Sequence, residues 1–80
     1  MKLDHTPRFK KNLEKFPKEI RKKFYKQSTF ILRDLRHPSL HAKKHDETLG
    51  IWQGRVDKNV RFYFLIENDT YVFIDIRYHD

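Results

Sequence analysis

Residues 60–80 read VRFYFLIENDTYVFIDIRYHD, two runs rich in β-branched and aromatic residues around a short polar break. This composition is typical of strands, and a polar break between two such runs predicts a β-hairpin. Alternate side chains of a strand point to opposite faces of a sheet, so the hairpin has an apolar face and a face that carries chemistry. The expected apolar set is Val60, Phe62, Phe64, Ile66, Val72, Ile74 and Ile76, and the expected opposite set is Arg61, Tyr63, Phe73, Asp75, Arg77 and His79.

The same alternation predicts the loops at either end of the run 60–66. Directly paired residues share a face of the sheet. A loop of three residues before this run pairs Arg55 with Arg61, whereas a loop of two would bring charge into the core. By the same argument the loop after the run has three or five residues, which keeps Phe62 from pairing with Asp75.

Two helices are expected before the hairpin. Thr6-Pro7 is typical of a helix start, with the threonine hydroxyl as N-cap and proline where no backbone donor is missed. Pro17 ends this helix and opens a second one, which is expected to run from Lys18 to Leu35. Short strands are expected over residues 1–5, 41–45 and 51–57.

These elements predict a fold of the α+β class. The apolar sides of the helices must be buried, and the sheet is the only surface that can cover them. We therefore expect an αα-hairpin packed on one face of a small, mainly antiparallel twisted sheet, in the order β-α-α-β-β-β, with three or four strands after the helices. Residues 1–80 are expected to form a single domain, since a chain of this length supports one core. Its expected centre is Phe24, Ile31, Phe62, Phe64 and Ile74.

Positive charge is concentrated in the first half of the chain. Residues 1–44 carry 14 Lys+Arg and 4 Asp+Glu, a net charge of +10, whereas the whole chain carries +7. A basic surface of this size attracts phosphate backbones or an acidic protein partner, although helical lysines are often only a solvated face.

The chain has no cysteine, which excludes disulfides and thiolate metal sites and fits a reducing cytoplasm. No apolar run approaches the ~20 residues of a membrane helix, so no membrane association is expected.

The order of these motifs resembles the RelE/ParE toxin superfamily of prokaryotic toxin–antitoxin modules. The resemblance covers essentially the whole chain and implies the RelE-like fold. Arg61 and His79 make the chain more similar to the RelE and YoeB ribonuclease branches than to the ParE gyrase poisons. The segments that carry the resemblance are TPRF at 6–9, RHPSLHAKK at 36–44, GIWQGRV at 50–56, VRFYF at 60–64 and RYHD at 77–80.

The resemblance implies the toxin of a type II toxin–antitoxin module, an endoribonuclease (mRNA interferase) that cuts mRNA at the ribosome and so inhibits translation in the cytoplasm. The 2′-hydroxyl of the RNA attacks the neighbouring phosphate, which requires a base, an acid and cations at the phosphate oxygens but no metal and no cofactor. The implied partners are mRNA, the ribosome and a cognate antitoxin with an acidic, amphipathic segment. Two alternatives stay open: a ParE-like toxin that binds DNA gyrase without chemistry, and a catalytically decayed RNA-binding homologue.

The resemblance and the predicted faces together give the candidate site. Histidine transfers protons near neutral pH, and the arginine fork donates two hydrogen bonds to a phosphate. Arg61 is the expected phosphate clamp, Arg55 lies across from it, and His79 is the expected proton donor or acceptor. The alternative role is to pair with Asp75 or Asp57 for Arg55, and to neutralise Asp75 for Arg77. The expected RNA-binding cations along the rim are Lys43, Lys44 and Arg77, and of the two lysines one is expected to reach the RNA and the other to face solvent.

The general base is the open part of this site. Glu47 is the only carboxylate near the groove that is expected to serve as the base, and an ordinary loop acid is the alternative reading. His41 and His45 flank the lysine pair and are weaker candidates, and a metal site built from them is not expected. Asp80 adjoins His79, and its carboxylate is expected to favour an acid role for that histidine.

Overall fold

A computed structural model describes residues 1–79 of the protein. Five strands form one mixed sheet in the order β1-β5-β4-β3-β2, in which β1 is parallel to β5 and the other neighbours are antiparallel. The elements are β1 (Lys2–His5), α1 (Pro7–Glu14), α2 (Lys18–Arg33), the 3-10 helix η1 (Pro38–Leu40), β2 (Lys43–Asp46), β3 (Ile51–Arg55), β4 (Val60–Glu67) and β5 (Thr70–Tyr78).

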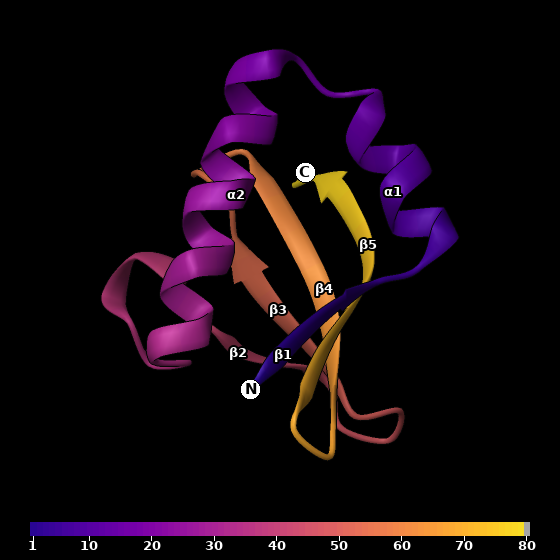
Figure 1. Ribbon diagram of the computed structural model, residues 1–80, viewed down its shortest axis with the longest axis vertical. Helices are drawn as coiled ribbons and strands as arrows, with labels where there is room; N and C mark the ends of the chain where they lie inside the picture. The colour runs from indigo at the N-terminus through magenta and orange to yellow at the C-terminus, as the bar shows by residue number, and fades with distance from the viewer. Residues whose placement is uncertain (80) are drawn as a thin grey trace.

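The two helices pack on one face of the sheet, and α1 lies alongside β5 (Figure 1). The Thr6 hydroxyl accepts a hydrogen bond from the Phe9 amide at 3.2 Å and Pro7 opens α1, as the sequence predicts. α2 ends two residues before the expected Leu35, because Asp34 adopts an extended backbone. The predicted α+β fold is confirmed. Neither helix within residues 1–79 combines the length and apolar character of a membrane span.

Phenylalanine is the commonest residue in the core between the helices and the sheet. Of the five residues predicted at its centre, four are fully buried: Phe24, Ile31, Phe62 and Phe64. The Phe24 ring on α2 lies 5.6 Å from that of Phe62. Opposite Phe62, β3 carries Gly54, where a Cβ would come within 2.8 Å of the ring. Glycine at this position therefore lets the Phe62 ring lie flat against the strand.

The first predicted loop is confirmed. Arg55 pairs with Arg61, and the Val56 amide donates to the Val60 carbonyl at 2.9 Å, which leaves a loop of three residues. The Asp57 carboxylate closes this loop by accepting hydrogen bonds from the backbone amides of Asn59 and Val60.

The second predicted loop is wrong. Glu67 pairs with Thr70, so the turn has two residues, and Asn68 takes up a left-handed conformation there (φ 54°). A β-bulge corrects the register farther along: Tyr63 pairs with Asp75, and Phe64 pairs with Phe73. Phe62 therefore still lies beside an isoleucine, Ile76.

The bulge also reassigns side chains between the turn and Ile74. Phe73 is fully buried in the core, although the sequence predicted it on the opposite face. Val72 and Ile74 were predicted in the core, but both are only partly buried, and Ile74 lines a cleft on the opposite face. Ile66 is 37% exposed near the turn and does not join the core. One extra residue in β5 inverts the alternation on one side of the bulge and preserves it on the other.

Candidate functional site

Three arginines form a row across the outer face of the sheet, the face turned away from the helices. Arg55 on β3 is the direct cross-strand partner of Arg61 on β4, which is in turn the partner of Arg77 on β5. Neighbouring strands lie about 4.8 Å apart, and like charges placed directly opposite one another are destabilising. The arginine row therefore has an electrostatic cost that a bound anion would relieve.

The arginine row borders a cleft of about 390 Å³, which we call the basic cleft. His79 follows Arg77 by two residues and so shares its face, and its amide donates to the Asn59 carbonyl at 2.7 Å. No described residue that lines the cleft is acidic, so the cleft favours a negatively charged ligand. Its lining is His41, Ala42, Lys43, Gln53, Arg55, Arg61 and His79.

Arg61 is the most deeply placed cation of the basic cleft, with 5% of its surface exposed. One guanidinium nitrogen donates to the carbonyls of Asp57 at 2.8 Å and Val60 at 3.3 Å. Within residues 1–79 no carboxylate forms an ion pair with Arg61 or Arg55. Neutral carbonyls thus orient the Arg61 side chain and leave its positive charge available to a ligand.

A buried glutamine on α2 ties the walls of the basic cleft together. The Gln27 amide nitrogen donates to the carbonyl of Arg55 at 2.8 Å and to that of Ser39 at 3.0 Å. Its amide oxygen accepts from the Ser39 hydroxyl at 3.1 Å. Gln27 is 6% exposed, so these hydrogen bonds are shielded from water. They fix the end of β3 and the η1 segment relative to each other.

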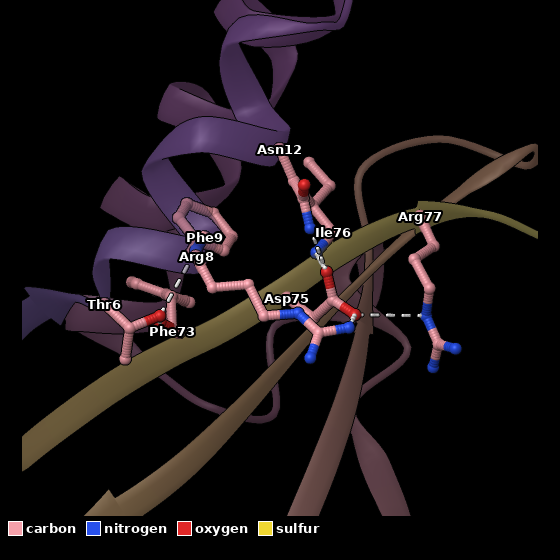
Figure 2. A network of polar contacts seen from close by, with 8 residues as sticks. All are labelled: Thr6, Arg8, Phe9, Asn12, Phe73, Asp75, Ile76 and Arg77. Atoms are coloured by element: carbon pink, nitrogen blue, oxygen red, sulfur yellow. Dashed lines mark hydrogen bonds and ion pairs between the residues drawn. The ribbon is translucent and has the colours of Figure 1, made fainter.

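Asp75 organises the neighbouring part of the outer face (Figure 2). Its carboxylate accepts from the Asn12 side chain at 2.8 Å and the Ile76 amide at 2.9 Å, which joins α1 to β5. The guanidinium groups of Arg8 and Arg77 each approach it to 3.5 Å, from different sides. Asp75 is 9% exposed and needs these partners to keep its charge inside the protein.

Arg77 has two partners on this part of the sheet. Besides Asp75, its guanidinium carbon lies 4.4 Å from the centre of the Tyr63 ring, a cation–π contact. The two residues border a second cleft of about 510 Å³ on the same face. Of the two roles that the sequence left open for Arg77, the pairing with Asp75 is present, and its half-exposed side chain still reaches solvent.

Four of the predicted site residues lie together in the basic cleft: Lys43, Arg55, Arg61 and His79. Arg77 adjoins His79 in a neighbouring hollow. The expected carboxylate partners of Arg55 are engaged elsewhere, Asp57 with Lys23 at 3.8 Å and Asp75 with Arg8 and Arg77. The predicted roles of these residues stay predictions, but their predicted common location agrees with the structure.

Two predicted positions are wrong. Lys44 pairs with Trp52, and its ammonium lies 5.1 Å from the centre of the indole ring, so it lies on the helix side and not in the cleft. The reason is the alternation of β2, which sends Lys43 and Lys44 to opposite faces.

The second wrong position is that of Glu47. It is exposed in the β2–β3 turn, beside the start of β3, whereas Arg55 is at the end of β3. About four strand residues, or ~13 Å, separate the two. Asp80, which was expected to act on His79, lies outside the described residues.

Sequence reasoning missed Gln27 and undervalued His41. Gln27 occupies a core position in the α2 stripe of Ile20, Phe24 and Ile31, and a polar residue at such a position signals a buried network. His41 was ranked with the weak histidines, yet it lines the basic cleft. The turn that brings it there depends on a left-handed backbone, which no local sequence pattern indicated.

The fold is that of the RelE/ParE toxins. A YoeB/ParE toxin from Agrobacterium tumefaciens matches with a TM-score of 0.80 and 17% identity over 100% of both chains. The YoeB dimer from Staphylococcus aureus gives a TM-score of 0.82 and 16% identity over 100% of this chain and 98% of that one. RelE in the RelB-RelE antitoxin-toxin complex from Methanococcus jannaschii gives 0.73 and 21% over 94% and 88%. No family model and no curated protein matches the sequence.

Proposed function

We propose that this protein is the toxin of a type II toxin–antitoxin module and that it cleaves mRNA as an endoribonuclease in the cytoplasm. The observation that carries the proposal is the arginine row beside a cleft that also holds His79. Membership of the RelE/ParE toxin superfamily is part of the proposal, and it is supported by the whole-chain likeness in fold to YoeB and RelE toxins.

The arrangement suits cleavage of RNA by its own 2′-hydroxyl. The 2′-oxygen attacks phosphorus, the bond from phosphorus to the 5′-oxygen breaks, and a 2′,3′-cyclic phosphate and a free 5′-hydroxyl result. Charge develops on the phosphate oxygens in the transition state, where Arg61 and Arg55 donate hydrogen bonds. His79 transfers a proton, and Lys43 and Arg77 hold the flanking backbone.

The second candidate is a toxin that acts by binding alone, as a ParE-like gyrase inhibitor. Two observations favour considering this candidate: the sequence identities are low, and the name of the Agrobacterium match includes ParE. The composition of the basic cleft favours the ribonuclease, because a pure binding surface has no use for an imidazole beside a buried, unneutralised arginine.

The test is expression of the parent, Arg61→Ala and Arg33→Ala, followed by mapping of mRNA 5′ ends. Arg33 is an exposed arginine in the last turn of α2 and serves as the matched control. The proposal predicts cuts inside translated frames with the parent and Arg33→Ala, and none with Arg61→Ala. Growth arrest by all three chains without new 5′ ends would instead favour the binding toxin.

A cognate antitoxin and the ribosome are the proposed macromolecular partners. Several of the structures that share the fold are complexes of toxin and antitoxin, among them YoeB-YefM from Staphylococcus aureus. The net charge of +10 over residues 1–44 suits an acidic antitoxin segment and, equally, the RNA backbone of a ribosome.

A further inference from the structure

His41 combines a strained backbone with a place in the basic cleft. Its φ of 46° lies in the left-handed region, which glycine occupies freely and other residues occupy at a cost. It caps η1, and its amide donates to the Pro38 carbonyl at 3.3 Å. Glycine is the usual residue at such a helix end. A histidine that stays in this conformation at a ligand cleft points to a role for its side chain.

The structure holds His41 in a defined position relative to the other residues of the cleft. η1 ends immediately before it, and Gln27 binds both the Ser39 carbonyl of η1 and the Arg55 carbonyl at the end of β3. His41 and His79 are the two imidazoles that line the cleft, together with the cations Lys43, Arg55 and Arg61. A phosphate bound by the arginines would therefore have two imidazoles within the same cavity of about 390 Å³.

We propose that His41 is the general base of the RNA cleavage reaction and that His79 is its general acid, an inference that rests on the function proposed above. The His41 imidazole takes the proton of the 2′-hydroxyl as the 2′-oxygen bonds to phosphorus. The His79 imidazolium gives a proton to the 5′-oxygen as its bond to phosphorus breaks. One proton is taken and one is given, and no electron is transferred to or from the protein.

Position excludes the carboxylate that the sequence suggested for this role. Glu47 lies in the turn at the opposite end of β3, and it does not line the basic cleft. Asp75 and Asp57, each two residues from an arginine of the row, are engaged by Arg8, Arg77 and Lys23. Among residues 1–79, His41 is the second imidazole of the cleft, and histidine is the side chain that ordinarily exchanges protons near neutral pH.

The first experiment separates catalysis from folding by using two matched substitutions. His41→Gly removes the imidazole and also relieves the left-handed strain. Asn68→Gly does the same for the strain in the β4–β5 turn, which is remote from the cleft. We expect both variants to melt at or above the parental temperature. Cleavage of an RNA oligonucleotide should fall ~10²–10⁴-fold in His41→Gly only.

The second experiment assigns base and acid with a substrate whose leaving 5′-oxygen is replaced by sulfur. A thiolate leaves without protonation, because thiols are far more acidic than alcohols. On this substrate His79→Ala should recover most of the parental rate, whereas His41→Gly should remain slow. The pH profile on the oxygen substrate gives a second readout. The parental cleavage rate should rise with pH on the acidic side as the general base loses its proton, and this rise should be absent in His41→Gly.

The possible failures are distinguishable. Cleavage by His41→Gly at the parental rate would overturn the proposal for His41 and leave the ribonuclease function intact. Recovery of His41→Gly on the sulfur substrate would make His41 the acid and also overturn the assignment. A parent that cuts no RNA, alone or on ribosomes, would overturn the proposed function itself.

Discussion

At the scale of single residues, the notable property of Arg61 is that its charge is buried without a carboxylate partner within residues 1–79. Its buried guanidinium is held by backbone carbonyls, and within residues 1–79 it forms no ion pair. A charge in such surroundings is poorly solvated, so it gains more from a phosphate than an exposed lysine does. Arg61 is therefore expected to stabilise the transition state more than it contributes to affinity for RNA.

Purified Arg61→Ala should show this division. Cleavage is expected to fall by about 10²–10³, the usual effect of losing one preorganised donor. RNA binding should fall much less, because Arg55 and Lys43 remain in the cleft. Single-turnover cleavage and direct binding of an uncleavable 2′-deoxy oligonucleotide measure the two effects. Equal losses in both would show that Arg61 contributes only to binding.

His5 is expected to make stability depend on pH. It packs 5.2 Å from the Phe73 ring and 5.6 Å from the Phe9 ring, and burial, aided by the nearby Lys10 charge, lowers its pKa in spite of Asp4. The unfolded chain then binds the proton more readily than the folded chain. Stability from neutral His5 is therefore present above its ordinary pKa and is lost as pH falls through the lowered folded value.

Denaturant unfolding of the parent and His5→Leu from about pH 7.5 to about pH 5 tests this dependence. The parent should lose more stability than the variant over that range, because leucine takes up no proton. Identical pH dependence in both proteins would show that His5 is protonated equally well in the folded and unfolded chains.

At the scale of elements, the connection between α2 and the cleft has its own test. Gln27→Leu keeps the volume of the side chain approximately but removes its bonds to Ser39 and Arg55. Buried carbonyls left without a partner cost about 1–3 kcal/mol each. The end of β3 would also lose its fixed position beside η1.

Gln27→Leu is therefore expected to unfold at lower denaturant and to cleave RNA more slowly even where it is fully folded. Thr29→Ala is the control, since Thr29 is exposed on the same helix and its hydroxyl donates a hydrogen bond to the Lys26 carbonyl of that helix. Normal cleavage by folded Gln27→Leu would show that the bridge serves stability alone.

The elements also show how far sequence reasoning reaches. The N-cap at Thr6, the proline between the helices and the pairing of Arg55 with Arg61 follow from local chemistry and alternation, and all three were predicted. The β-bulge beside Phe64 was not predicted, because the alternation of apolar residues in β5 does not show where an extra residue is inserted. Ile74 looked like a core residue for this reason.

The same limit applies to the candidate site. Arg61, Arg55 and His79 could be placed on one face because strand alternation fixes their direction. His41 could not be placed, since its position depends on a left-handed turn after η1 and on a hydrogen bond from Gln27 to a neighbouring carbonyl. Such long-range contacts become visible only in the folded chain.

At the scale of the whole molecule, the asymmetry of charge predicts how the protein meets a partner. If an acidic antitoxin segment binds the basic surface, its association rate should fall steeply as salt rises, because screening shortens the reach of the attraction. Stopped-flow association from about 0.05 to about 0.5 M salt measures this effect. A rate that is independent of salt would indicate an encounter driven mainly by apolar contact.

The position of β5 in the sheet has a consequence for how the protein is made. β5 is the last strand within residues 1–79, yet it lies between β1 and β4, and its pairing with β1 joins Lys2–His5 to residues some seventy positions later. A ribosome therefore releases every other described element before β5, the strand that carries Arg77 and leads into His79. A nascent chain cannot assemble the basic cleft until β5 and His79 have left the ribosome. Chains that stop short of β5 lack a central strand and leave Phe9 and Phe62 without Phe73, so we expect them to be degraded and to have no partial activity.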